Sequence, residues 1–294
     1  MLVALAVAVA SIGLLALSAL RERRVLQKAH WGHDIARIRE LRSSHSDERL
    51  GPLRVVGLGA SQLGRATYVD ARMDAVAQQE GVQFRYVQIA RVGGRFDDWA
   101  PLMARVREAR PDIVVIEDRL LFWQHAPDDL ALVGEHCEDM LRRIRNGHSP
   151  VVSVRQAAGM ARGFARDRRV QYREITPSEL QEVRKIRLRR LGASLREGGK
   201  ESLEALRSDG VVVILLSMPV DALVRRGPDA ASLYRELDSQ IDSLVDAGLV
   251  VRLDCPLAFK RSDFRDLRHM MPQGRDRYSR WLIHELDRMA KAKP

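Results

Sequence analysis

Leu53-Arg-Val-Val-Gly-Leu-Gly-Ala-Ser61-Gln-Leu-Gly64 is the stretch that decides the fold. Its first part is an apolar run containing the β-branched residues Val55 and Val56, which is typical of a buried strand. Helical spacing of apolar residues begins at Ala66, so Ser61 stands between a strand and a helix. Unpaired backbone amides at such a junction suit a developing negative charge or a bound phosphate. The pattern is also typical of a plain turn with a capping serine.

Length and composition bound the possibilities. The 294 residues are enough for one large α/β domain or two small ones, and 46% hydrophobic content supports a sizeable core. The formal charge of +10 permits anionic partners. Aromatic residues make up only 5% and the sequence holds no nucleic-acid-binding motif, so a nucleic-acid partner is not expected. Cys137 and Cys255 are too few for a disulfide scaffold, and they could pair only if the fold brings them together.

The N-terminus carries a membrane-targeting pattern. Leu2–Leu20 holds no charged residue and is about long enough to cross a bilayer. We therefore expect a transmembrane anchor or uncleaved signal at 1–20, a charged juxtamembrane helix and linker at 21–50, and a folded domain at 51–294. The span is followed by basic residues, which favour a cytoplasmic domain by the positive-inside tendency. These residues are Arg21, Arg23, Arg24 and Lys28.

After Pro52, short apolar runs alternate with amphipathic helical stretches, as in βαβ units with a parallel sheet. The expected strands are Leu53–Leu58, Val82–Ile89, Asp112–Ile116, Val211–Ser217 and Leu249–Leu253. The expected helices are Met73–Gln79, Trp99–Ala109, Asp129–Ile144 and Leu233–Ala247. Because crossovers are right-handed, the simplest solution is an α/β fold with a doubly wound, flavodoxin-like, five-stranded parallel sheet between two helical layers.

Ligands of such sheets bind beyond the carboxyl ends of the strands. Polar segments follow the expected strands at this edge: Ser61 after the first, Arg91–Arg95 after the second, Glu117–Arg119 after the third and Asp263–His269 after the fifth. The sequence therefore predicts that these polar residues share one rim of the sheet.

A long insertion separates the third and fourth expected strands. Its part at 155–207 contains 14 Lys/Arg and 7 Asp/Glu, a net charge of +7. One interpretation is a solvated helical insertion. The other is a lid or docking element that attracts an anionic polymer such as a glycan, lipid headgroups or an acidic protein partner.

Asp266-Leu-Arg-His269 lies between the last expected strand and an amphipathic terminal helix. An Asp and a His at this spacing can share one face of a turn, where the carboxylate orients the imidazole and stabilises imidazolium. The other ring nitrogen is then able to take a proton from a serine. Because this pair is predicted to lie on the same rim as Ser61, the three residues form a candidate catalytic set.

Gly59-Ala-Ser61 after the first strand, together with Asp266-Leu-Arg-His269 before a C-terminal helix, resembles the SGNH-hydrolase or GDSL-type esterase family. The resemblance implies that Ser61 is a nucleophile, that His269 is a general base and then an acid, and that Asp266 orients it. It also implies oxyanion donors at the Ser61 amide and at Gly93 or Gly94. The family's usual Gly-Asp-Ser reads Gly-Ala-Ser here.

The third block departs from the family pattern. Where a Gly-x-Asn-Asp motif would follow the third strand, the chain has Ile116-Glu-Asp-Arg119 and therefore offers no asparagine donor. Asp118 could donate only when protonated, whereas Arg119 is a permanent donor that could stabilise an oxyanion or bind an anionic substrate group. The competing interpretation is a salt-bridged strand end.

Three functional hypotheses follow. The first is a serine-dependent ester hydrolase or O-acyltransferase that acts on an acyl ester, acetyl in the first instance, of a glycan or cell-envelope polymer. The second is a catalytically inactive, membrane-tethered binding or assembly module with the same fold, and the third is a cytoplasmic nucleotide-binding domain. The family resemblance implies a single-pass inner or plasma membrane protein with an extracytoplasmic, periplasmic domain, in contrast to the flanking charges. No cofactor is expected, because phosphate-loop and dinucleotide motifs are missing from the sequence, and no metal is expected, because the histidines lack ligand spacing.

Overall fold

The computed structural model describes residues 31–42, 51–91, 94, 96–122, 194–225 and 228–292, together with positions 145, 176–178, 180 and 181. The chain divides into two compact units, one of residues 1–36 and 126–166 and the other of residues 37–125 and 167–294. In the first unit the described positions, 31–36 and 145, are helical. The second unit contains the sheet and the described candidate site residues.

The sheet has five strands: β1 (Leu53–Gly59), β2 (Phe84–Ala90), β3 (Ile113–Glu117), β4 (Val212–Leu216) and β5 (Val251–Leu253). Neighbouring strands are all parallel, in the order β2-β1-β3-β4-β5. This confirms the five-stranded parallel α/β sheet that was predicted. The order reverses at β1 and β3, so the ends of these two strands form the crevice where ligands of doubly wound sheets bind.

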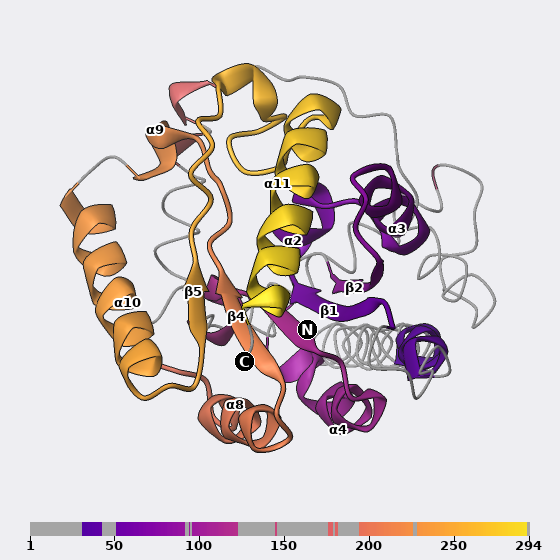
Figure 1. Cartoon of the computed structure of the whole chain (residues 1–294). Coiled ribbons are helices and arrows are strands. Elements are labelled where there is room, and N and C mark those ends of the chain that lie inside the picture. Colours follow the sequence, from indigo (N-terminus) through magenta and orange to yellow (C-terminus); the bar gives the residue numbers. More distant parts are fainter. Residues whose placement is uncertain are drawn as a thin grey trace, which may run out of the picture. The chain divides into compact units, whose positions relative to one another are not determined.

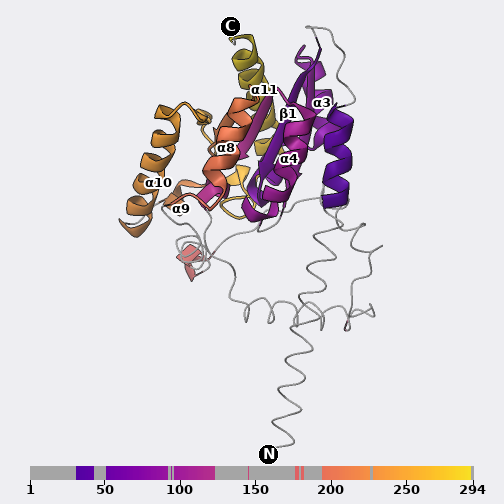
Figure 2. The same ribbon diagram turned by 90° about the horizontal axis from the view of Figure 1, so that it is seen from below.

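Helices cover both faces of the sheet (Figure 1). One face carries α2 (Ser61–Ala66), α3 (Asp70–Gln79) and α11 (Pro272–Lys291), and the other carries α4 (Ala100–Ala109), α8 (Gly199–Ser208) and α10 (Pro228–Asp246), as the rotated view in Figure 2 also shows. Shorter elements are η1 (Phe96–Asp98), η2 (Asp118–Phe122), α9 (Ala222–Arg225) and η3 (Arg261–Asp263). The second unit is thus a three-layer α/β/α structure.

Four strands start later than the sequence predicted: β3 starts one residue late, and β2, β4 and β5 start late for one shared reason. A glycine with positive φ ends the preceding helix, and the next residue donates its N–H back to a helical carbonyl, as in a Schellman cap. The three caps are Gly81 with Val82 bonded to Ala77, Gly210 with Val211 bonded to Leu206, and Gly248 with Leu249 bonded to Leu244. The first apolar residue of each of these three expected strands therefore belongs to a helix end.

The sequence also predicted the wrong first residue for the helices α3, α4 and α10. α3 begins at Asp70, because an acidic residue in the first turn favours the helix N-terminus. α10 begins at Pro228, because proline suits the first helical position. Trp99 is the N-cap of α4 and not part of it, and its buried indole donates a hydrogen bond to the Ile89 carbonyl at 3.0 Å.

The core on the α11 side follows from side-chain periodicity. Alternate residues of the strands, such as Val115 in β3 and Ile214 in β4, point to this face. α11 places Tyr278, Leu282 and Leu286 against them at helical spacing, and all three are fully buried. Burial of this stripe fixes α11 on the sheet and hence fixes the loop that precedes it.

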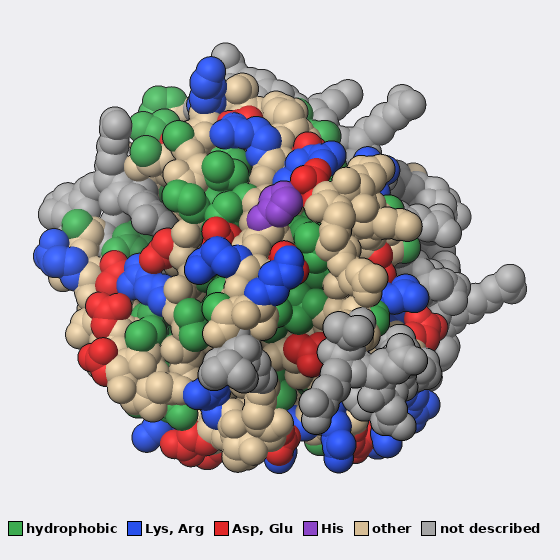
Figure 3. All heavy atoms as spheres, viewed as in Figure 1, with side chains coloured by type: hydrophobic (Ala, Val, Ile, Leu, Met, Phe, Trp, Pro, Cys, Tyr) green, Lys and Arg blue, Asp and Glu red, His purple; other side chains and the backbone are tan. Residues whose placement is uncertain are grey.

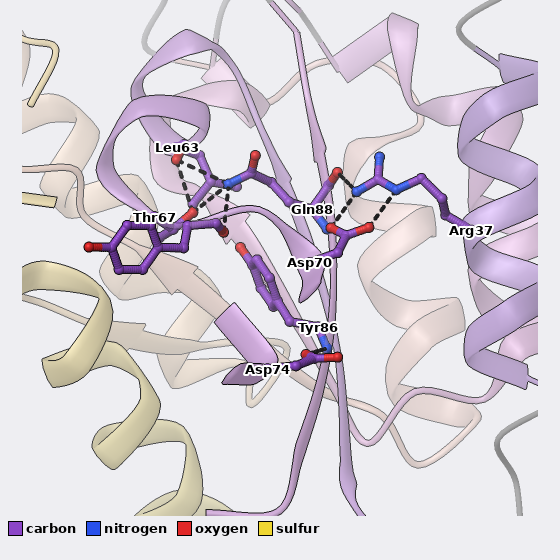
Figure 4. Close-up of polar contacts among 8 residues, drawn as sticks. Arg37, Leu63, Thr67, Asp70, Asp74, Tyr86 and Gln88 are labelled. Carbon is purple, nitrogen blue, oxygen red and sulfur yellow. Dashed lines mark hydrogen bonds and ion pairs between the residues drawn. The ribbon is translucent and has the colours of Figure 1, made fainter. Parts of the chain in front are cut away.

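A buried polar network anchors the chain around α2 (Figure 4). Gln88 of β2 donates through Nε2 to Thr67 Oγ1 at 2.5 Å, just after α2 ends. The backbone amide of Gln88 donates to Asp70 Oδ1 at 2.9 Å, and its carbonyl accepts a hydrogen bond from Arg37. Arg37 also donates through Nε to Asp70 Oδ2 at 2.6 Å. The network ties the C-terminal end of α2 and the start of α3 to the edge strand.

Several predictions concern residues that the structure does not describe. Leu2–Leu20, Asp129–Ile144 and Cys137 all lie outside the described residues, as does most of the insertion at 155–207. Among the described residues, no helix has the length and apolar character required for a membrane span. Cys255 is a free thiol, and burial raises its pKa to about 11.

Charged side chains on the face seen in Figure 3 alternate in sign and do not gather into one patch. Arg252 of β5 forms ion pairs with Asp238 at 2.8 Å and with Asp254 at 2.8 Å.

Candidate active site

Ser61 is the first residue of α2, directly after β1 and Ala60. Ala60, not Ser61, is the N-cap, so the serine hydroxyl does not cap its own helix. The turn is tight at Gly59, where a Cβ atom would lie 2.4 Å from Leu63 Cβ. Only glycine therefore fits at this position without a shift of α2. The strand end and the helix start together hold the Ser61 side chain at the carboxyl edge of the sheet.

Asp266 and His269 lie in the loop between η3 and α11. An isolated antiparallel bridge between Phe264 and Met270 closes the loop, and the Arg265 amide donates to the His269 carbonyl at 2.8 Å. Leu267, at the centre, has a left-handed φ of 70°, which is uncommon for a residue with a side chain. Its side chain is buried and its carbonyl accepts a hydrogen bond from the Asp221 amide at 2.8 Å, which stabilises the turn.

The structure brings Ser61, His269 and Asp266 into one hydrogen-bonded chain. Ser61 Oγ lies 2.9 Å from His269 Nε2. His269 Nδ1 lies 2.9 Å from Asp266 Oδ1 and 2.8 Å from Oδ2. The His269 backbone amide also donates to Asp266 Oδ1, at 3.0 Å. Residues separated by 208 positions in sequence thus meet at the distances that proton transfer requires.

The charge of Asp266 orients the imidazole. Burial raises the pKa of this carboxyl, but the hydrogen bond and charge of His269 and the His269 amide outweigh burial and lower the pKa to about 2. Asp266 is therefore ionised at neutral pH and accepts the Nδ1 proton of His269. Nε2 is left to accept the proton of the Ser61 hydroxyl. The His269 side chain is 20% exposed, so the pair is open to a ligand.

Direct hydrogen bonds join α11 to α2 and to the loop that follows α2, and so hold the two halves of the site together. Arg275 Nε donates to the Arg65 carbonyl at 3.1 Å. The Tyr68 amide donates to Ser279 Oγ at 3.1 Å, and Ser279 is fully buried. The loop with His269 and the helix with Ser61 are therefore parts of one packed body.

The predicted oxyanion donors have different outcomes. The Ser61 amide makes no hydrogen bond with another residue in the described part of the chain, and it can therefore serve as a donor. The Gly94 amide donates to the Arg91 carbonyl at 3.1 Å, so in this structure it is not available for an oxyanion. Gly93 lies outside the described residues.

Asp118 and Arg119 are both buried. Asp118 Oδ1 accepts a hydrogen bond from the Arg119 amide at 2.7 Å. The Arg119 guanidinium lies 5.1 Å from the centre of the Tyr234 ring of α10. Both residues line a cavity of about 130 Å³ whose lining does not include Ser61, Asp266 or His269. Their predicted role in binding an oxyanion or a substrate group stays a prediction.

Glu117, which sequence reasoning treated only as part of a strand end, is a neighbour of the nucleophile turn. It is fully buried at the end of β3, and its Oε2 accepts the Ala60 amide at 2.7 Å and the Leu63 amide at 3.2 Å. Burial raises its pKa to about 7. One feature of the sequence could have indicated this role of Glu117. Its carboxyl occupies an inward-facing position directly after the apolar run Ile113–Ile116, where an acidic side chain is rarely buried without partners.

No group of His, Cys, Asp and Glu with the arrangement of a metal site occurs among the described residues. The chemistry of the serine, imidazole and carboxylate needs no bound metal or organic cofactor.

The comparisons with known proteins concern the fold. No family model matches the sequence, and no curated protein is similar to it at a significant level. Among solved structures, the chain is similar to a GDSL-like lipase from Bacteroides thetaiotaomicron, with 13% identity, 87% of this chain and 98% of that chain covered, and a TM-score of 0.42. It is similar to a variant of an acetyl-xylooligosaccharide esterase from Geobacillus, with 11% identity, 81% and 96% covered, and a TM-score of 0.39.

A third similar structure is an SGNH-hydrolase family esterase, with 16% identity, 83% and 99% covered, and a TM-score of 0.33. All three TM-scores lie below 0.5, so no argument rests on these likenesses, and the activity is inferred from the geometry of the site.

Proposed function

We propose that the protein is a serine-dependent ester hydrolase or O-acyltransferase in which Ser61 is the nucleophile. The observation that carries the proposal is the continuous hydrogen-bonded chain from Ser61 Oγ through His269 to Asp266. An isolated serine hydroxyl is a weak nucleophile, and a neighbouring base held by a third group is the arrangement that activates it.

In the proposed reaction, His269 Nε2 takes the Ser61 proton as Oγ attacks the ester carbonyl carbon. The tetrahedral oxyanion is stabilised by the Ser61 amide and by a second donor in the Arg91–Arg95 segment, for which Gly93 is the candidate. Asp266 stabilises the imidazolium that forms. The imidazolium then protonates the leaving alkoxide, which leaves an acyl-serine.

Water or a sugar hydroxyl completes the cycle. His269 takes a proton from this acceptor, the acceptor oxygen attacks the acyl-serine, and the Ser61 oxygen recovers its proton from the imidazolium. Water as acceptor makes the protein a hydrolase, and a sugar hydroxyl makes it an O-acyltransferase. We propose an acyl ester of a glycan or cell-envelope polymer as substrate and a membrane-anchored, extracytoplasmic domain. The support for this finer proposal is the apolar run Leu2–Leu20 together with the family resemblance of the sequence.

The test uses the full chain in detergent, with 4-nitrophenyl acetate as substrate. We expect turnover by the wild type, and we expect Ser61→Ala to lower kcat/KM by at least about 1,000-fold. Ser243→Ala, at an exposed serine on α10, is the matched control and should keep wild-type activity. A fluorophosphonate probe should label the wild type and the control, but not Ser61→Ala.

Two results would count against the proposal. Equal turnover by the wild type and Ser61→Ala would remove Ser61 from the mechanism. A folded wild type that neither turns over the ester nor reacts with the probe would favour the inactive binding module, whose support is the missing asparagine after β3.

A further inference from the structure

Glu117 touches the nucleophile turn on both sides of Ser61. Its Oε2 accepts the amide of Ala60, one residue before the serine, and the amide of Leu63, two residues after it. These hydrogen bonds are 2.7 and 3.2 Å long, and Glu117 itself is fully buried. One carboxyl oxygen from β3 therefore holds the backbone that presents the hydroxyl.

The rest of the turn depends on this contact. α2 has no side-chain cap of its own and no acidic residue in its first turn, so Glu117 satisfies amides that the helix leaves unpaired. The approach is possible because residue 59 is glycine: a Cβ there would lie 3.0 Å from Glu117 Oε2. The contact therefore depends on a residue of each strand, Gly59 in β1 and Glu117 in β3.

The surroundings disfavour the charged form of Glu117. Burial raises its pKa to about 7; the Ala60 amide opposes this shift, Asp118 adds to it, and the Leu63 amide and Arg119 oppose it. Tyr278 of α11 also interacts with Glu117: the pKa of this phenol is raised first by burial, then by Cys255, Asp118, Tyr86 and Glu117. Glu117 Oε1 is buried without a hydrogen-bond partner in the described part of the chain, which is costly for an ionised carboxylate.

We propose that Glu117 is a positioning residue for Ser61, and that the turn stabilises an oxyanion best when Glu117 is in its uncharged acid form. This inference rests on the proposed function. The Ser61 amide lies between the two amides that Glu117 binds, so a carboxylate charge there opposes the negative charge that develops on the substrate. The neutral acid still accepts both amides through its carbonyl oxygen, and therefore keeps the geometry without the charge.

Two substitutions in the full chain separate position from charge. Glu117→Gln keeps an oxygen that accepts the two amides and removes the charge, whereas Glu117→Ala removes the acceptor. The measurement is kcat/KM for 4-nitrophenyl acetate between pH 5 and 9, expressed as the ratio of Glu117→Gln to wild type. Because the two proteins differ only at position 117, the ratio reports the effect of this side chain.

We expect this ratio to be constant below about pH 6 and to rise through about pH 7 to about 10-fold by pH 9. Glu117→Ala should be less active than wild type at every pH. Glu204→Gln, at an exposed carboxylate of α8, is the control and should give a ratio near 1 throughout. A ratio that stays flat or falls with pH would overturn the role of the uncharged form, and wild-type activity of Glu117→Ala would overturn the positioning role.

The pH dependence of the free energy of unfolding tests the state of Glu117 independently of catalysis. Because the folded pKa of Glu117 lies above its unfolded value, the folded wild type binds this proton more tightly than the unfolded chain does. Wild type should therefore lose stability relative to Glu117→Gln as pH rises from about 4.5 to about 7, with the ratio of unfolding constants changing by about 300-fold. No Ser61-dependent turnover would contradict the proposed function, whereas a pH-independent stability difference would contradict the inference about Glu117 alone.

Discussion

The ends of β1 and β3 lie side by side in the sheet, yet their polar residues do different things. After β1, Ser61 projects to a histidine from the far end of the chain. At the end of β3, the Glu117 carboxyl accepts a hydrogen bond from the Ala60 amide in the serine turn, whereas Arg119 packs on Tyr234 of α10. Polar residues that reach the same edge of a parallel sheet thus share a rim, but the direction of each side chain decides which of them face the ligand.

Asp266→Asn tests the β1 side of this comparison with the largest expected effect. An asparagine can donate to Nδ1 and so favours the tautomer that protonates Nε2, which can no longer take the Ser61 proton. We expect kcat at pH 7 to fall by about 10,000-fold while the fold is kept. The control is Asp242→Asn, at an exposed carboxylate on α10. A loss of less than about tenfold would show that Asp266 does not orient the base.

Gly59→Ala tests how closely the two strand ends are fitted together. The added methyl would meet Leu63 Cβ at 2.4 Å and Glu117 Oε2 at 3.0 Å, so α2 would have to move. We expect a loss of about 1–3 kcal/mol in the free energy of unfolding, measured by urea titration, and a clear loss of kcat. Gly32→Ala is the control, because a Cβ at Gly32 meets nothing within 4 Å. Unchanged activity in Gly59→Ala would show that the turn tolerates displacement.

Arg119→Gln tests the β3 side and should have the smallest effect on catalysis. Since Arg119 stacks on Tyr234, its loss should cost about 1–2 kcal/mol of stability and leave kcat/KM for a neutral ester nearly unchanged. Loss of an oxyanion donor would instead lower kcat by about 100-fold or more. The kcat/KM of the folded variant therefore decides whether Arg119 only lines the cavity or also stabilises the oxyanion.

The fold was largely predictable from the sequence, because the spacing of apolar residues along the chain indicates which side chains are buried. Apolar runs identified all five strands, and their parallel arrangement follows from the helices between them. Boundaries were less predictable. Val82, Val211 and Leu249 look like strand residues because they are apolar and β-branched or aliphatic, but their N–H groups complete helix caps after glycines.

The sequence by itself determined which residues stand at the rim of the sheet, and it singled out Ser61, Asp266 and His269 from their order and spacing. The tertiary structure decided which of the rim residues meet. Packing of α11 on the sheet brings His269 to Ser61, and the pleat of β3 directs Glu117 to the serine turn, while Arg119 packs on α10. Spacing along a chain specifies the face of one element, but contacts between elements depend on how their faces pack, which no local pattern encodes.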